Sequence, residues 1–394
     1  MTISAAAPRR VLIVGAGALG ISLAYHLQQL GLPHVQLVER QFPGSGSTGW
    51  SAGLVSVQLW NPDDVRLVLR SWELFTLAAT RAHLSVERPG MYTLASEADA
   101  ATLQTNVTAQ QSVGAPVELV PRAAWAERLP TLQLDDVGAI SYAAGDGMVA
   151  PGDYALALAG ISRKRGAQIL QNTPVRSLLV RDDVVRGITL GDGRTLEAEV
   201  VVLAAGVWSA RLCESAGLGL PVCPYRTQIA ILKMAQARAQ PIVHDAAAGM
   251  YFRPEADEEL LVGDGTTHHR EDPDHYDESA NVQFVESVAE RLLHRMPAAA
   301  SAMPAAGWAG LVLGTPDRLP LIGPHPTVEG LWLCLGGNGF GLMRAPALGE
   351  LAAHRLLQRP LPSALRGLEG YGLPQRLADR WSALSVAQSG FTLR

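Results

Sequence analysis

The opening forty residues carry the feature that most restricts the fold: a strand, a glycine turn and a helix in succession. Residues 10–14 are an apolar run of strand-forming type, three glycines between positions 15 and 20 interrupt it, and residues 21–30 show helical apolar spacing. A second apolar run at 35–38 fits a parallel sheet that is covered on both faces. The segment predicts a βαβ unit and an α/β fold.

The glycine spacing in this turn is typical of dinucleotide binding. Gly15 permits the tight turn, Gly17 lets the backbone approach a pyrophosphate, and Gly20 lets the helix pack on the strand. Glu39 ends the second strand about 20 residues further on, where a carboxylate accepts hydrogen bonds from ribose hydroxyls. The alternative is a surface glutamate that merely follows a buried strand.

Strand, glycine loop and helix recur later in the chain. An apolar strand at 200–203 ends in Ala-Ala-Gly, and another at 331–335 precedes a glycine loop and a helix through 347–357. We therefore expect a Rossmann-like domain interleaved with an α+β domain that is built on a mostly antiparallel sheet. The first would comprise 1–80, 146–215 and 310–394, and the second 81–145 and 216–309.

NAD and FAD can both use this fingerprint, so the choice depends on features outside it. A polar, glycine-rich loop at 45–53 follows the βαβ unit directly, and two further glycine turns follow strands near the middle and the end of the chain. An extended flavin needs backbone donors at its pyrophosphate, beside its ring, and at the pyrimidine edge where negative charge develops. These three separated turns favour FAD, and an NAD-dependent dehydrogenase is the alternative.

A set of motifs extends over nearly the full chain: residues 11–20 with Glu39 and Arg40, then 46–53, 204–208, 249–255, 308–311, 315–323 and 336–350. In these motifs the sequence resembles the FAD-dependent amine and amino acid oxidoreductases of the D-amino acid oxidase superfamily, and within that superfamily the sarcosine oxidase and glycine oxidase branch. The resemblance implies hydride transfer to the flavin from the carbon next to an amine nitrogen, followed by hydrolysis of the imine.

The resemblance also implies which residues contact FAD. Val175 would lie beside the adenine, and the 81–145 and 216–309 segments would build a sheet over the substrate face of the flavin. Some relatives attach the flavin through a cysteine where this chain has Gly310, so FAD is expected to be non-covalent. The implied FAD contacts are Gly15, Gly17, Ala18, Leu19, Gly20, Glu39, Arg40, Ser47, Thr48, Gly49, Trp50, Ala52, Gly53, Leu54, Val175, Ala205, Gly206, Trp208, Gly339, Phe340, Gly341, Leu342 and Met343.

Four family positions are changed in this chain. The arginine that clamps the substrate carboxylate in glycine oxidase-like members is replaced by Val312, and the histidine and lysine of the C-terminal glycine loop of sarcosine oxidases are replaced by Phe340 and Met343. These apolar residues favour either a larger apolar substrate or a carboxylate held by a different arginine. A further lysine that promotes oxygen reduction in monomeric sarcosine oxidases is replaced by Leu261, which favours dehydrogenase behaviour.

The candidate catalytic residues are Tyr251, Arg253, Phe340 and Met343. Tyr251 either hydrogen-bonds a polar substrate group or packs, and Arg253 either faces the substrate or pairs with Glu255 or Asp245. Trp50 either stacks near the flavin or fills space.

Three other residues are weaker candidates for a role in substrate binding or catalysis. We expect Arg344 to be exposed or interfacial, although it is the other arginine able to hold a carboxylate. The adjacent His268 and His269 lie in a loop-like segment and are expected to be solvated rather than to act as a base.

Composition excludes several other classes. The 32 basic and 37 acidic residues give a net charge of −5 without a basic block, so no nucleic-acid partner is expected. No apolar stretch is long enough for a membrane span, and Arg9 and Arg10 precede a glycine-rich run rather than a signal sequence, so we expect a cytoplasmic protein. Three cysteines without paired spacing predict buried thiols and no metal site.

The partners follow from this class of reaction. We expect a small amine or amino acid substrate and oxygen, a quinone or an electron-transfer protein as acceptor, in a homo- or hetero-oligomer. The alternative function is a flavoprotein subunit that passes electrons to a partner and has a degraded substrate pocket.

Overall fold

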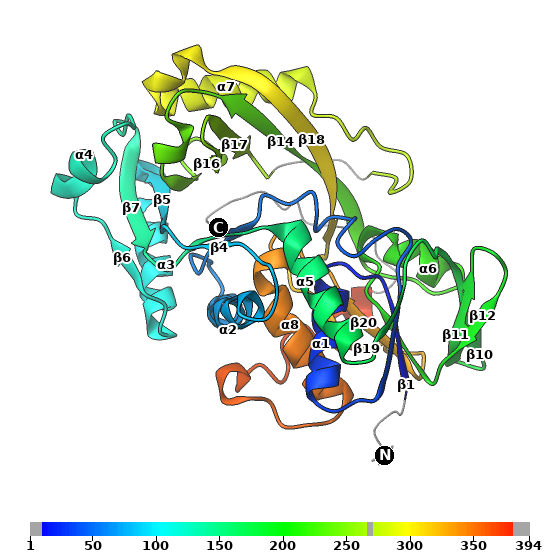
Figure 1. The fold of residues 1–394 in the computed structure, drawn as a ribbon. Coiled ribbons are helices and arrows are strands. Elements are labelled where there is room, and N and C mark those ends of the chain that lie inside the picture. The colour runs from blue at the N-terminus through cyan, green and yellow to red at the C-terminus, as the bar shows by residue number, and fades with distance from the viewer. Residues whose placement is uncertain (1–9, 266–270, 381–394) are drawn as a thin grey trace.

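A six-stranded, mostly parallel sheet lies at the base of the computed structural model, which describes residues 10–265 and 271–380 (Figure 1). The strand order is β19-β20-β13-β1-β2-β9, and β19 pairs antiparallel with its neighbour. The strands are β1 (Arg10–Val14), β2 (His34–Val38), β9 (Gln168–Leu170), β13 (Val200–Leu203), β19 (Leu321–Pro324) and β20 (Leu331–Leu335).

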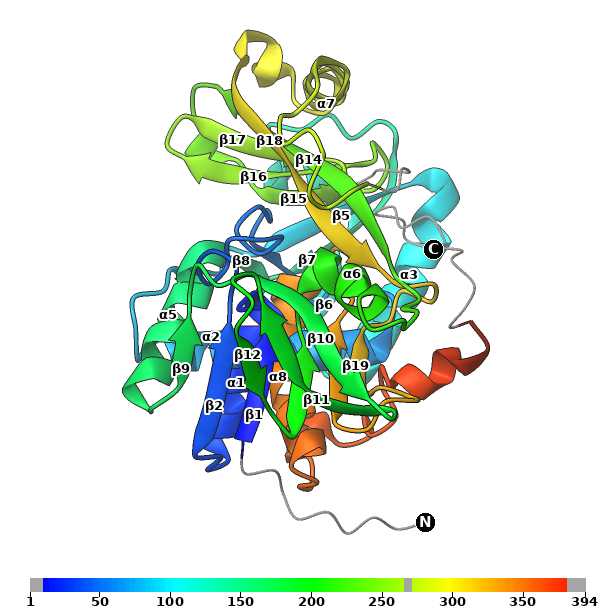
Figure 2. The same ribbon diagram turned by 90° about the vertical axis from the view of Figure 1, so that its right-hand side faces the viewer.

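The central strand β1 is buried on both faces, which explains its continuous apolar run. Val11 and Ile13 belong to the core beneath the helices α1 (Ala18–Gln29), α5 (Pro151–Lys164) and α8 (Gly341–Leu356), with α2 (Pro62–Ala79) packed against α8. Leu12 and Val14 point the other way, into a core shared with a three-stranded sheet (Figure 2). That sheet contains β10 (Val175–Arg181), β11 (Val184–Leu190) and β12 (Thr195–Glu197).

An eight-stranded sheet forms the second large body, in the order β18-β14-β17-β16-β15-β5-β7-β6. All neighbouring strands are antiparallel except β15 and β5. The strands are β5 (Met91–Ser96), β6 (Val117–Leu119), β7 (Val137–Ala143), β14 (Cys223–Lys233), β15 (Ile242–Asp245), β16 (Met250–Ala256), β17 (Glu259–Gly263) and β18 (Met303–Gly314).

The two faces of this second sheet have different neighbours. Helix α7 (Val282–Arg295) covers the outer face, where Phe252 and Val262 pack with Phe284 and Val288. The other face points toward the six-stranded sheet (Figures 1 and 2). The remaining helices and strands are β3 (Leu54–Val55), β4 (Val86–Glu87) and β8 (Gly147–Val149), which form a small sheet, and α3 (Ala100–Ser112), α4 (Trp125–Arg128) and α6 (Ser209–Glu214).

The predicted fold class is confirmed: a Rossmann-like parallel sheet is interleaved along the chain with a mostly antiparallel sheet. The domain boundaries remain a proposal. Strand β18 runs through the proposed boundary between 309 and 310, so one continuous strand joins the two bodies.

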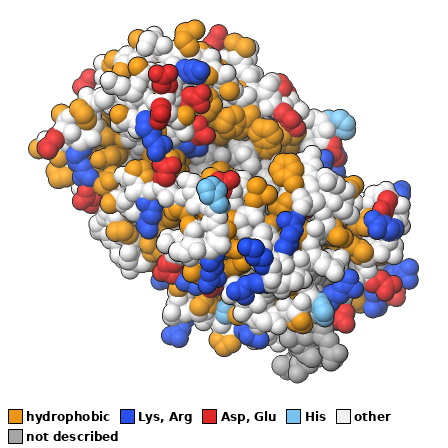
Figure 3. All heavy atoms as spheres, in the orientation of Figure 1, with side chains coloured by type: hydrophobic (Ala, Val, Ile, Leu, Met, Phe, Trp, Pro, Cys, Tyr) orange, Lys and Arg blue, Asp and Glu red, His pale blue; other side chains and the backbone are white. Residues whose placement is uncertain are grey.

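On the face shown in Figure 3, acidic and basic side chains are interspersed.

A buried arginine ties α7 to the second sheet. Arg295 is 0% exposed, and its guanidinium donates to Asp245 (Nε to Oδ2, 2.6 Å) and to Asp136 (Nη1 to Oδ1, 2.7 Å). Asp245 is also 0% exposed, so the Arg295 guanidinium is the neighbouring counter-ion of a buried carboxylate. Hydrogen bonds from Arg295 lower the pKa of Asp136, so its stabilising contribution is present at neutral pH and is lost as acid protonates the carboxylate.

We expect Arg295→Leu to lower the free energy of unfolding by about 3–5 kcal/mol, because it leaves the Asp245 charge buried without a partner. Urea unfolding measures the loss. Asp136→Asn is the control and should cost less, since that carboxylate is 41% exposed and water can replace the contact. Equal losses in the two variants would contradict this account.

Candidate active site

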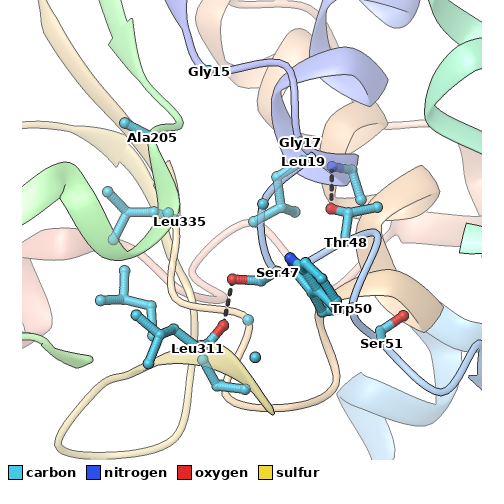
Figure 4. Close-up of a pocket in the computed structure, with 18 of the residues that line it drawn as sticks. Gly15, Gly17, Leu19, Ser47, Thr48, Trp50, Ser51, Ala205, Leu311 and Leu335 are labelled. Atoms are coloured by element: carbon cyan, nitrogen blue, oxygen red, sulfur yellow. Dashed lines mark hydrogen bonds between the residues drawn. The ribbon is translucent and has the colours of Figure 1, made fainter. Parts of the chain in front are cut away.

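The carboxyl ends of β1, β2, β13 and β20 open into a cavity of about 960 Å³ that extends to the inner face of the eight-stranded sheet (Figure 4). In α/β sheets, ligands bind where the carboxyl ends of strands meet. The glycine turn lies in this cavity. Gly15 has φ +104°, and a Cβ there would lie 2.4 Å from the Ala204 carbonyl oxygen of the neighbouring strand end.

The N-terminus of α1 points amide groups into the same cavity. Gly17 is its N-cap residue and supplies no side-chain cap. The Ala18 amide donates to Thr48 Oγ1 at 2.9 Å, which ties the 45–53 loop to the helix end. A Cβ on Gly20 would lie 2.1 Å from the Gly15 carbonyl oxygen, so helix and turn meet without room for a side chain. This arrangement suits a pyrophosphate.

Glu39 is buried at the end of β2 and lines the cavity. Its Oε2 accepts from the Ala16 amide at 2.8 Å and its Oε1 from the Gln41 amide at 3.0 Å. These two bonds fix the carboxylate, and each oxygen retains acceptor capacity for a hydroxyl group. We refer to this part of the cavity as the Glu39 end.

A short strap, residues 271–276, crosses the cavity near the Glu39 end. Asp274 accepts from Trp208 Nε1 at 2.8 Å and pairs with Arg40 at 3.2 Å, while Arg211 pairs with Asp272 at 2.5 Å. The Arg40 guanidinium also lies 4.5 Å from the centre of the Trp208 ring. The strap belongs to the segment between β17 and α7, so it links the second sheet to the first.

The 45–53 loop reaches β18 in the middle of the cavity. Trp308 Nε1 donates to the Trp50 carbonyl at 3.0 Å, and Ser47 Oγ donates to the Leu311 carbonyl (Figure 4). The Trp50 side chain is 37% exposed. A Cβ on Gly310 would lie 2.8 Å from Trp50 Cβ, so the glycine at 310 allows this tryptophan to approach the strand.

At its other end, which we call the ring end, the cavity meets the inner face of the second sheet. Tyr251 on β16 is buried there, and burial raises the pKa of its phenol well above the usual value. The phenol lies across Gly263 of β17, where a Cβ would be 2.3 Å from Tyr251 Oη. Four residues that were not predicted from the sequence also line the cavity. Tyr225, Thr227 and Ile229 alternate along β14, and Trp60 precedes α2.

The C-terminal glycine loop completes the ring end. Asn338 Oδ1 accepts from the Thr315 amide at 2.8 Å, and Asn338 Nδ2 donates to the Gly336 carbonyl at 2.6 Å. Phe340 and Met343 line the cavity, and the Phe340 ring meets Trp60 edge-to-face with centroids 5.3 Å apart. The two apolar replacements noted in the sequence therefore lie together.

The two candidate arginines are engaged elsewhere. Arg253 is absent from the described lining of the cavity: Nε donates to the Ala52 carbonyl at 2.6 Å, and Nη1 pairs with Glu255 at 2.5 Å. The expectation that Arg344 is exposed or interfacial is wrong. Arg344 is 1% exposed, because it pairs with Asp64 on α2 and donates to the Gly337 carbonyl at 2.8 Å.

Other candidates lie away from the cavity. Leu261 is buried in the apolar cluster around Tyr251 and does not line the described cavity. His268 and His269 lie outside the described residues. Cys213 and Cys334 are buried as expected, whereas Cys223 is half-buried.

Within residues 10–265 and 271–380, no cluster of three His, Cys, Asp or Glu could hold a metal. None of the helices that the structure describes is both long and apolar enough to cross a bilayer.

Comparison with known proteins identifies the class. The DAO family, described as FAD dependent oxidoreductase, matches residues 10–355. The chain belongs to this family, and its cofactor is FAD, so the NAD alternative is set aside. The glycine turn, the N-terminus of α1 and Glu39 fit the pyrophosphate and ribose of that cofactor.

Individual relatives are moderately similar. Glycine oxidase of Pseudomonas aeruginosa is 31% identical over 91% of this chain and 99% of its own length, and that of Geobacillus kaustophilus is 29% identical over 87% and 91%. The crystal structure of L-proline dehydrogenase from P. horikoshii is 25% identical, with a TM-score of 0.82, over 93% of this chain and 100% of that one.

Two glycine substitutions separate the folding role of the turn from its binding role. We expect Gly15→Ala to destabilise the protein by about 1–3 kcal/mol, since φ is positive and backbone atoms occupy the Cβ position. Gly17→Ala should leave the stability of the apoprotein unchanged, because its Cβ would meet only Thr48 Oγ1 at 3.5 Å, yet it should weaken FAD binding. Thermal unfolding of the apoprotein and FAD titration measure the two effects, and wild-type FAD affinity in Gly17→Ala would contradict the assignment.

Proposed function

We propose that this protein oxidises the carbon–nitrogen bond of a small amine or amino acid, whether N-methyl, cyclic or primary. The observation that carries the proposal is the continuity of the cavity from the dinucleotide turn to Tyr251 on the second sheet. The names of the relatives support it: glycine oxidase, human dimethylglycine dehydrogenase at 27% identity, and an iminodiacetate oxidase structure at 26%.

The chain contributes binding and environment to this reaction. FAD, when bound, supplies an acceptor for the hydride on the carbon next to nitrogen. The α1 N-terminus and Glu39 would hold its pyrophosphate and ribose. At the ring end, Phe340, Met343, Trp60 and Ile229 present apolar surface to the substrate. Desolvation disfavours an ammonium ion, so this surface lowers the pKa of the amine and favours the neutral form that is oxidised.

The alternative is an electron-passing subunit whose own substrate pocket is degraded, and Val312 in place of the family arginine favours it. Anaerobic mixing of the FAD-loaded chain with glycine, alanine, sarcosine, N-methylalanine, dimethylglycine, iminodiacetate and proline distinguishes the two. Bleaching of the flavin absorbance by any of these amines supports the proposed enzyme. Failure of all of them to reduce the flavin would favour the alternative.

We expect FAD to be held without a covalent bond. Gly310 occupies the position of the cysteine used by some relatives, and Cys334, which lines the cavity, is an unreactive thiol because burial raises its pKa to about 12. Acid precipitation should release all of the flavin into the supernatant. A yellow pellet after washing would show that this expectation is wrong.

Glu39→Ala should weaken FAD binding by about 1.5–3 kcal/mol, because it removes charge-assisted hydrogen bonds to the ribose. The same change frees the Ala16 and Gln41 amides, so Glu39→Gln is the matched control: it keeps one acceptor oxygen and should bind with intermediate affinity. Reconstitution of each apoprotein with FAD gives the affinities. Unchanged flavin occupancy of the alanine variant after dialysis would refute the ribose assignment.

We expect slow reoxidation by oxygen and faster turnover with a dye or quinone. A fixed cation stabilises the negative charge that develops during oxygen reduction. The chain has two lysines, Lys164 and Lys233, and both are exposed and outside the described lining of the cavity, so no lysine takes the place of the one that Leu261 replaces. Stopped-flow reoxidation of the photoreduced enzyme in air-saturated buffer gives the rate, and a value equal to turnover with dye would count against dehydrogenase behaviour.

A further inference from the structure

A second, smaller cavity lies against the ring end of the main one. It has a volume of about 30 Å³, enough for a water molecule or a hydroxyl group. Leu54, Trp60, Phe340 and Met343 line both cavities and form the partition between them. Because a methionine side chain is flexible, this partition can admit a short substituent. We call this small cavity the side chamber.

A row of polar side chains leads from the main cavity to the side chamber. Tyr251, His244, Thr93 and Ser141 are direct register partners on β16, β15, β5 and β7. Direct partners on neighbouring strands present their side chains on the same face, so the four form one line across the inner face of the sheet. Tyr251 lines the main cavity, and His244 and Thr93 line the side chamber.

Thr93 is the member of this row whose bonding is incomplete. It is 1% exposed, and within the described residues its Oγ1 has no hydrogen-bond partner. A buried hydroxyl without a partner is costly, so a threonine in this place implies a ligand group that bonds to it. A valine would fill the same volume without that cost.

The other polar groups around the side chamber make it uncharged. Ser56 Oγ donates to Asp146 at 2.6 Å, and Gln58 Nε2 donates to the Met91 carbonyl at 3.0 Å, so both are already engaged. Burial lowers the pKa of His244 to about 4, so its ring is neutral at physiological pH. No Asp, Glu, Lys or Arg is among the described residues that line the side chamber. The site therefore suits a neutral group rather than a carboxylate or an ammonium.

We propose that the side chamber is a specificity subsite that receives a short, uncharged hydrogen-bonding substituent of the substrate, such as a hydroxyl, and that Thr93 recognises it. This inference rests on the proposed amine oxidation. It assigns a substrate class within that function: amines with a hydroxyl-type group near the oxidised carbon. The Thr93 hydroxyl donates to the substituent or accepts from it.

The test compares substrates that differ by one hydroxyl group. The FAD-loaded enzyme is reduced anaerobically by alanine or serine, by their N-methyl derivatives, and by proline or 4-hydroxyproline, each in both configurations. The measured quantity is the ratio of second-order reduction rates within each pair. We expect the hydroxylated member of at least one pair to be preferred. Thr93→Val should lower that preference about tenfold, and Thr93→Ser, which retains the hydroxyl, should preserve it.

Controls separate this role from a structural one. Thr93→Val should not lower the thermal midpoint of the FAD-loaded or the apoprotein, because it removes a hydroxyl that lacks a partner. Thr105→Val, on the exposed face of α3, should change neither the midpoint nor the ratios. A lower midpoint with unchanged ratios in Thr93→Val would show that the side chamber holds only water, and would overturn the proposal.

Two other outcomes distinguish failure of the subsite from failure of the proposed function. A wild-type enzyme that accepts amines without preferring any hydroxylated member also overturns the subsite. If no amine in any series reduces the flavin, the proposed function itself fails, which is a different outcome from the loss of hydroxyl selectivity in an active enzyme.

Discussion

The parallel pairing of β1 with both β2 and β13 is the constraint on which the rest of the structure depends. It brings the ends of three segments that are distant in sequence to a single edge, where the Gly15 turn touches the Ala204 carbonyl. The close approach of Gly15 to this carbonyl leaves no room for a side chain at position 15. The two faces of β1 fill two separate cores, Val11 and Ile13 on one side and Leu12 and Val14 on the other, so the positions of Glu39 and the α1 amides are fixed by packing.

The second sheet faces this edge and lines the rest of the cavity. Its inner face presents apolar side chains broken by the line from Tyr251 to Ser141, whereas its outer face is closed by α7. Strand β18 belongs to this sheet and also reaches the 45–53 loop through Gly310 and Trp50. The geometry in the middle of the cavity therefore depends on a contact between the two bodies.

Sequence reasoning found the parts of the site that depend on local pattern and missed those that depend on distant partners. The first helix was expected from residue 21 but begins at Ala18, since its first turn contains glycine rather than an apolar stripe. The sequence predicts a last helix through 347–357, and the structure has it from Gly341 to Leu356 with Pro346 inside it. Arg344 could not be placed, because its partner Asp64 lies 280 residues away. The side chamber likewise arises from strand register, which no single segment reveals.

The strap at 271–276 has a consequence for how the cavity is held together. Asp274 connects it to Arg40 and Trp208, so it closes over a cavity that a long dinucleotide must enter. These ion pairs are exposed, and salt screens such pairs, so the contact of the strap with Arg40 and Arg211 is weaker at high ionic strength. The edge of the cavity near Glu39 is therefore held by charge, whereas the floor of the same cavity is held by the packing of buried strands.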